Sequence, residues 1–399
     1  MDLAVRDIAH HKGKFVATII GVGLLFAVVL SMNGIYRGFI FEGLSAIKVT
    51  NPDLWVVERY RGGPFNEQST IPDFFHYSIE AIEGVEKASP FIFYGVERMI
   101  QGKRKRFTII GYDVFGGLGG PQKLTAGRHI RRAHYEMVAH EKLKFRLGDT
   151  IPLGLHNYTV VGLFNDGTAP DGEPLVYVSL PDAQEILYLR DNEEIRNQRE
   201  RLLKTLTAPG RMIAEQVQQY MPLLEINTHM VNAHLVKLKP EANPMEVARK
   251  IEKNLYFSVY TTQQQIDLMM QGRLAMPRKQ LLLFRIILLI VSVVIISLVI
   301  YTFTMEKIRS IAVMKLIGAP NRLIIRLVLE QSLLMTAGSY LVGLVIIHNT
   351  YHYFPRLVRL TPFDDTVTFF IALAGALIAS VLGIVQAIKT EPALALGGN

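Results

Sequence analysis

A short charged segment between two long apolar runs holds the residues whose spacing best suits an interaction with another molecule. Met305 to Pro320 (MEKIRSIAVMKLIGAP) has apolar residues at helical spacing with charges among them. The apolar stripe consists of Met305, Ile308, Ile311, Ala312 and Leu316, and the charged residues are Glu306, Lys307, Arg309 and Lys315. Gly318 and Pro320 end the predicted helix. Such an amphipathic helix either lies on a bilayer surface or docks into a groove of a partner, and its pattern alone leaves both open.

A second charged pair lies inside an apolar run. Glu330 falls about two turns into the run that begins at Leu323, where a charge is costly unless it is paired or faces protein. Arg326, four residues earlier, lies on the same helical face. The sequence therefore predicts an intramembrane Arg326–Glu330 pair, either with a mechanistic role or as a simple interfacial pair.

The sequence contains no constellation that predicts a catalytic centre. It has no GxxxxGK(S/T) phosphate loop, and the His140-Glu141 start of a zinc-protease motif fails because Lys144 stands where the second histidine is needed. His348 and His352 are four residues apart and could bind a metal, or could be two interfacial histidines. With no cysteine, disulfides and iron–sulfur clusters are excluded. We expect no catalytic, cofactor or metal site in this chain.

These segments lie among four apolar runs, each long enough to cross a bilayer, which needs roughly 20 helical residues. The predicted spans are 15–35, about 281–304, about 323–347 and about 367–388. The first run is longer than a signal-peptide core and lacks a clear cleavage site, so we expect it to be retained. Lysine and arginine beside the spans place both termini and the 305–322 loop in the cytoplasm. The net charge of +8 is explained by contact with anionic lipids, without nucleic acid.

The fourth span also indicates how the helices pack. Gly375, Ala379 and Gly383 are spaced by four, and small residues at this spacing let helix backbones approach closely. We therefore predict a helix–helix interface along this face.

The remaining residues predict a mixed α/β domain. A helix leading into a strand occurs twice, at 78–93 and 244–260, which suggests two βαβ-like halves. Helices are expected over Pro72 to Val85, over Pro181 to Leu206, and from Pro244 after an Asn243 cap. The expected fold is an α-helical membrane protein with four transmembrane helices and a large extracytoplasmic α/β domain inserted between helices 1 and 2. The boundaries are 1–38, 39–280 and 281–399.

The segment MEKIRSIAVMKLIGAPNRLIIRLVLEQSLL resembles the signature of ABC-transporter permeases of the MacB/FtsX type. The matching positions are Glu306, Arg309, Ile311, Lys315, Gly318, Ala319 and Glu330. Ser310 departs from the family, in which an acidic residue is common. The N-terminal LAVRDIAHHKGKFVATIIGVGLLFAVVL, the tail KTEPALAL and several stretches of the large domain are similar to the same family.

The resemblance implies a permease subunit of the inner membrane that dimerises and binds a separate cytoplasmic ATPase, which holds ATP and magnesium. The 305–320 helix would couple the two chains. ATP hydrolysis would then drive the extracytoplasmic domain, a mechanism called mechanotransmission, to export or extract a substrate with a periplasmic adaptor and an outer-membrane duct. The separate-permease layout resembles the DevC-like and lipoprotein-releasing branches.

Three alternatives remain open. The first is an FtsX-like signalling subunit that activates a cell-wall hydrolase, although its outer domain is usually smaller. The second is a haem or metal exporter whose site at the outer membrane surface would use His348 and His352. The third is a membrane receptor with no ATPase, which the coupling-type helix disfavours.

Overall fold

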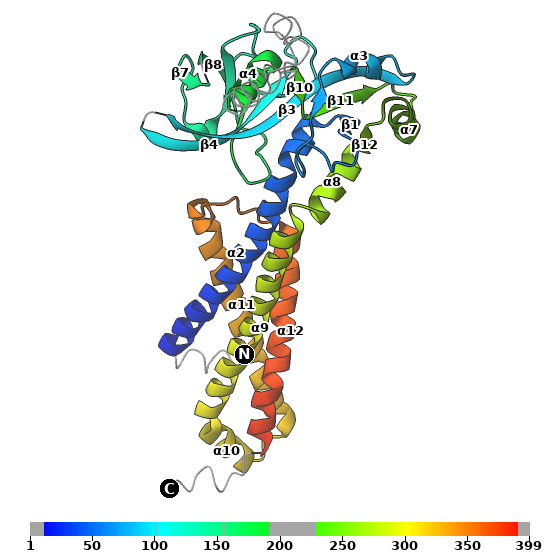
Figure 1. The fold of residues 1–399 in the computed structure, drawn as a ribbon. Helices are drawn as coiled ribbons and strands as arrows, with labels where there is room; N and C mark the ends of the chain where they lie inside the picture. Colours follow the sequence, from blue (N-terminus) through cyan, green and yellow to red (C-terminus); the bar gives the residue numbers. More distant parts are fainter. Residues whose placement is uncertain (1–11, 101, 155, 191–228, 390–399) are drawn as a thin grey trace, which may run out of the picture. The chain divides into compact units, whose positions relative to one another are not determined.

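The computed structural model describes residues 12–100, 102–154, 156–190 and 229–389 (Figure 1). The chain divides into two compact units, which are described separately. One unit is Met1–Ile40 together with Met276–Asn399, and the other is Phe41–Ala275.

The first unit is helical. It contains the part of α2 (Lys12–Thr50) up to Ile40, α9 (Ala275–Glu306), α10 (Ile308–Leu316), α11 (Asn321–Thr350), the short η2 (Tyr351–Tyr353) and α12 (Pro362–Lys389). Four of these helices are long and apolar enough to cross a membrane, and they coincide with the four predicted runs. α2 continues to Thr50, well past the end of the predicted span at Ile35.

All four long helices contribute to one apolar core. Phe26 of α2, Ile300 of α9, Met335 of α11 and Ala376 of α12 are buried together in this core. Many apolar side chains also stay exposed, among them Leu298 and Ile378. Helices that are apolar on both their inner and outer faces suit a lipid surrounding rather than water.

The second unit is built on a ten-stranded mixed sheet. Its first half has β1 (Leu54–Val57), β3 (Val85–Ile100), β11 (Ala233–Leu238) and β12 (Ser258–Thr261) in the order β12-β1-β11-β3, with antiparallel neighbours. α3 (Phe75–Glu80) joins β1 to β3, and α7 (Pro244–Leu255) joins β11 to β12. Each joined pair is therefore parallel with one strand of the other pair between, which makes two interleaved split βαβ units. This arrangement agrees with the two βαβ-like halves that the sequence suggested.

Local signals decide where the helices of this half begin and end. The Asn243 side chain accepts a hydrogen bond from the Met245 amide at 3.0 Å, and Pro244 occupies the first turn of α7, as predicted. α8 (Thr262–Gln271) begins with a capping box formed by Thr261 and Gln264. α3 is shorter than the helix expected over Pro72 to Val85: Pro72 lies in β2, and the helix ends at Glu80. Gly84, with a φ of +95°, then turns the chain into β3.

The second half of the sheet extends from β3. β4 (Lys103–Tyr112), β9 (Leu175–Ser179), β6 (Glu136–His140), β8 (His156–Phe164) and β5 (Ala126–Gly127) follow in that order, and β7 (Thr150–Leu153) pairs with β8. β2 (Ile71–Pro72) and β10 (Met230–Val231) form a separate pair. α4 (Leu180–Arg190) and the 3-10 turn η1 (Glu141–Leu143) complete the described elements. The part of the predicted 181–206 helix beyond Arg190 lies outside the described residues.

Candidate functional site

The predicted coupling segment is divided between two helices. α9 includes Met305 and ends at Glu306, Lys307 caps the next helix, and α10 covers Ile308–Leu316. Gly318 then adopts a φ of +94°, a conformation that favours glycine, and the chain turns through Pro320 into α11. The helix is thus shorter than the 305–320 segment, but its end falls at the predicted Gly318 turn.

α10 has one buried face and one exposed face. Ile311 and Ala312 are buried, and Ile311 packs against Ile324 at the start of α11. Leu316 is 61% exposed and Ile317 is 82% exposed. By helical spacing, Leu316 belongs to the same apolar stripe as the buried residues. However, α10 ends at this residue, and the contact with α11 is made by the middle of the helix. An apolar end of α10 is therefore left uncovered.

Most of the charged residues in this segment tie helices together. Glu306 Oε1 lies 3.2 Å from Lys14 Nζ, which links α9 to α2. Lys307 donates to Gln331 Oε1 of α11 at 3.2 Å. Lys315 donates to the carbonyl oxygen of Ile388 at 2.7 Å, at the C-terminal end of α12 where a cation is favourable.

Arg309 differs from these residues. Its side chain is exposed, and within the described part of the chain it has no ion-pair partner. It lies near the start of α10, about two turns before Leu316 on the same helical face, and its charge is available to another molecule.

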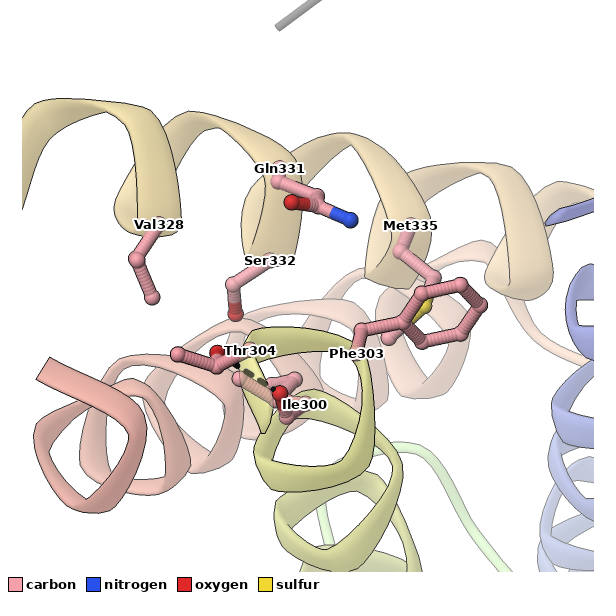
Figure 2. Close-up of a pocket in the computed structure, with 7 residues that line it drawn as sticks. All are labelled: Ile300, Phe303, Thr304, Val328, Gln331, Ser332 and Met335. Atoms are coloured by element: carbon pink, nitrogen blue, oxygen red, sulfur yellow. Dashed lines mark hydrogen bonds between the residues drawn. The ribbon is translucent and has the colours of Figure 1, made fainter. Parts of the chain in front are cut away.

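Figure 2 shows a small cavity between α9 and α11, close to the segment that carries α10. Its lining residues are Ile300, Phe303, Thr304, Val328, Gln331, Ser332 and Met335. Its volume is about 10 Å³, near the minimum for one water molecule. Thr304 Oγ1 donates to the Ile300 carbonyl at 2.9 Å and Ser332 Oγ donates to the Ala376 carbonyl at 3.2 Å. The contact between α9 and α11 is thus incompletely filled here. Fewer van der Waals contacts would be broken if the two helices shifted at this point.

Arg326 and Glu330 lie in α11 with Nε and Oε1 2.5 Å apart. The arginine side chain is 68% exposed and the glutamate side chain 31% exposed. This geometry is an i,i+4 pair on the helix surface, and its role in mechanism stays a prediction.

The small residues of α12 lie at helix contacts. A Cβ on Gly375 would stand 2.8 Å from Val293 Cγ2 of α9, so this position requires glycine for the observed approach. Ala379 is buried, whereas the surroundings of Gly383 lie outside the described part of the chain. A close contact that sequence reasoning missed joins α2 and α11, where Gly343 packs against the backbone and Cβ atoms of α2 around Phe26.

Sequence reasoning also missed a polar clamp between α2 and the start of α12. Arg37 donates to both carboxylate oxygens of Asp364, at 2.7 and 2.9 Å, and the aspartate side chain is only 10% exposed. Asn33, one turn earlier, donates to Thr368 Oγ1 at 2.8 Å. An arginine at the end of the first apolar run and an aspartate at the start of the fourth were the available signals.

The loop before α12 lies against two glycines of α2. The Arg359 amide donates to the Gly34 carbonyl at 3.0 Å, and a Cβ on Gly38 would overlap the backbone carbonyl of Leu357. Gly34 and Gly38 are spaced by four, so the same small-residue rule that singled out α12 applies to α2. Together with Arg37–Asp364, these contacts fix α2 to the α11–α12 loop.

The candidate histidines do not form a metal centre in the described residues. His348 Nδ1 lies 3.0 Å from the Leu344 carbonyl and donates to it, and the His352 ring lies 3.6 Å from the Tyr351 ring at a tilt of 39°. No group of three or more His, Cys, Asp or Glu side chains that could hold a metal occurs in the part of the chain that the structure describes. His140 accepts a hydrogen bond from the Lys142 amide at 3.1 Å.

Comparisons with known proteins agree with this architecture. Residues 15–254 match the MacB-like periplasmic core domain, and residues 282–391 match the FtsX-like permease C-terminal domain. An uncharacterized ABC transporter permease of Mycobacterium tuberculosis strain H37Rv is 25% identical over 396 residues, which is 99% of both chains. Another, from Mycobacterium bovis, is 24% identical over 397 residues, again 99% of both chains.

Solved structures with some similarity cover only part of the chain. The periplasmic region of MacB from Actinobacillus actinomycetemcomitans aligns with 53% of this chain and 89% of its own, at 11% identity and a TM-score of 0.33. The extracellular domain of the transporter YknZ from Gram-positive bacteria aligns with 53% of this chain and 99% of its own, also at 11% identity and 0.33.

The full-length matches and the four apolar helices define the class of protein, an ABC transporter permease. Within that class, the chain belongs to the MacB/FtsX-like family.

Proposed function

We propose that this chain is the non-catalytic membrane subunit of an ABC transporter and that it couples ATP hydrolysis on a separate ATPase to movement of its own extracytoplasmic domain. Both termini and α10 lie in the cytoplasm, and the α/β domain is inserted outside the inner membrane between the first and second spans. The distribution of lysine and arginine beside the apolar runs supports this orientation. ATP and magnesium are held by the partner, and a second copy of the permease completes the membrane part.

The observation that carries this proposal is the form of α10. One face is anchored by Ile311 and Ala312, while Leu316 and Ile317 stay exposed at the end of the helix. Arg309, about two turns before Leu316 on the same face, forms no ion pair with any residue that the structure describes. A helix that is fixed on one side and offers apolar side chains and a cation on its other face suits a groove in a partner protein. A helix that only rested on the bilayer would not need the polar ties to α11 and α12.

The same ties supply a route for movement. Lys307 and Lys315 connect the α10 segment to α11 and α12, and Glu306 connects it to α2. A displacement of α10 by an ATPase would therefore be passed to three of the four spans. The substrate is exported or extracted on the outer side, without a path between the spans. This is mechanotransmission.

The test is a pull-down of the tagged full-length chain in mild detergent, followed by quantitative mass spectrometry. We expect one soluble ATPase with a phosphate-loop sequence in stoichiometric amount. Arg309→Glu should reduce its recovery at least about tenfold, because reversing a charge in a docking surface removes attraction and adds repulsion. Lys279→Glu is the matched control, because it also reverses an exposed cation but lies in the first turns of α9, away from α10.

The outcomes separate the proposed function from its alternatives. A co-purifying adaptor would support export, whereas a cell-wall hydrolase would indicate the FtsX-like signalling role. If no ATPase accompanies the wild-type dimer, or if Arg309→Glu recovers as much as Lys279→Glu, the coupling role of α10 is wrong.

A further inference from the structure

β3 and β4 form a long hairpin at one end of the sheet's second half (Figure 1). Its basic residues lie on both faces. In its antiparallel register, Glu97 lies opposite Arg106, Arg98 opposite Lys105, and Met99 opposite Arg104. Directly opposed residues point to the same face of a sheet, and neighbours along a strand point to opposite faces. The register therefore places Arg104 and Arg106 on one face, and Arg98, Lys103 and Lys105 on the other.

On the first face, each arginine has a carboxylate partner. Arg104 Nε lies 3.0 Å from Glu97 Oε1, and Arg106 Nε lies 2.5 Å from Glu173 Oε1. This face is electrically balanced.

The second face is not balanced. Arg98 and Lys105 are directly opposed and Lys103 is their diagonal neighbour, an arrangement in which like charges destabilise a sheet. Arg98 Nη1 donates to the Glu97 carbonyl oxygen at 3.2 Å, which does not neutralise it. Among the residues that the structure describes, none of these three cations forms an ion pair.

Lys144, which follows η1, adds a fourth cation near this face. Lys105 Nζ donates to the Leu143 carbonyl at 2.7 Å and lies 4.2 Å from the centre of the Phe145 ring. Lys144 is the residue between these two contacts of Lys105. Lys144 has a φ of 56° and an exposed side chain. Burial lowers the pKa of Lys105, and the charges of Lys103 and Lys144 lower it further, against an opposing effect of Asp149. Asp149 is the one carboxylate among these influences on Lys105.

We propose that Arg98, Lys103, Lys105 and Lys144 form a binding site for a phosphate group. A compact, multiply charged anion would relieve the repulsion among these neighbouring cations, and lysine binds phosphate as a point charge. An extended acidic protein surface would instead be expected to engage the outer arginines, which already have partners. The phosphate could belong to a lipid headgroup or to a soluble phosphate compound. This inference goes beyond the proposed function and does not depend on it.

The test uses the full-length chain in a neutral, non-ionic detergent and isothermal titration calorimetry. Inorganic tripolyphosphate and the water-soluble dihexanoyl phosphatidic acid are titrated separately, with poly-glutamate as a third probe. Lys103→Gln/Lys144→Gln should weaken phosphate binding by about tenfold. Arg104→Gln/Arg106→Gln is the matched control, since it removes the same charge from the balanced face, and it should change the affinity less than about twofold.

Binding of tripolyphosphate alone would support a soluble phosphate source, and binding of the lipid alone would support a headgroup. Binding of both would support a site that recognises the phosphate group and not the rest of the ligand. Three results would overturn the proposal: no binding of either phosphate probe, an equal loss in the two double variants, or poly-glutamate binding as tight as that of the phosphates.

Discussion

His234 in β11 shows how a single buried group can control the response of the second unit to acid. The residue is fully buried, its Nε2 donates to the Pro72 carbonyl at 3.1 Å, and its Nδ1 has no hydrogen-bond partner in the described residues. Burial lowers its pKa to about 3, and the nearby His76 acts in the same direction. The unfolded chain therefore takes up a proton below a pH of about 6.5, while the folded chain does not until about 3. The free energy of unfolding must fall as the pH falls through this window.

We predict that His234→Gln reduces this acid sensitivity, because glutamine keeps a donor for Pro72 but does not titrate. The measurement is the thermal midpoint of the full-length chain in detergent at pH 7 and pH 5. The decrease between the two should be smaller in the variant by several degrees, which corresponds to about 1–2 kcal/mol. His229→Gln is the control, because His229 is a largely exposed histidine of the same unit. Equal decreases in all three proteins would contradict the assignment.

At the scale of elements, α2 is held to the α11–α12 loop by contacts that tolerate no side chain at Gly38. A Cβ there overlaps the Leu357 carbonyl, whereas a Cβ on Gly21 of the same helix meets no atom within 4 Å. Gly38→Ala should therefore destabilise the helical unit by about 1–3 kcal/mol through overpacking. Gly21→Ala should stabilise it by up to about 1 kcal/mol through helix propensity. The thermal midpoints of the two variants and the wild type are measured in the same detergent. If both variants shift the midpoint in the same direction, the contact between Gly38 and the α11–α12 loop can adjust to a side chain.

At the scale of the whole molecule, the Lys14–Glu306 pair joins the start of α2 to the end of α9, beside α10. Both side chains are largely exposed, at 69% and 49%, so the pair contributes only about 0–1 kcal/mol to stability. If it passes movement from α10 to α2, as the proposed function requires, Glu306→Lys should lower ATP-driven activity of the assembled transporter far more than it lowers the thermal midpoint. The exchanged pair Lys14→Glu/Glu306→Lys should restore activity.

The ATPase rate of the reconstituted permease–ATPase complex, with and without the exchange, checks this prediction. If the Glu306→Lys variant keeps its activity, the Lys14–Glu306 pair does not transmit movement from α10 to α2. A loss of activity that the exchange does not repair would mean that Glu306 contacts the partner rather than Lys14.

The amino-acid sequence by itself determined the features that depend on local chemistry. Four apolar runs predicted the four long helices because an uninterrupted apolar stretch of this length has few other stable structures. Asn243 and Pro244 predicted the start of α7, since capping involves neighbours along the chain. The glycine and proline at the end of the 305–320 segment predicted the turn at Gly318. The resemblance of this segment to MacB/FtsX-type permeases predicted the family. The orientation, the partners and the roles of the charged residues remain predictions.

The tertiary structure alone decided which distant residues meet. Arg37 and Asp364 are 327 positions apart, and their pairing depends on how α2 packs beside α12, which no local pattern encodes. The exposure of Leu316 and the close approach at Gly38 likewise depend on which neighbour covers a helix and where that neighbour ends. The unbalanced face of the β3–β4 hairpin could be identified only from the strand register. A one-residue shift in the register would move each cation of one strand to the opposite face.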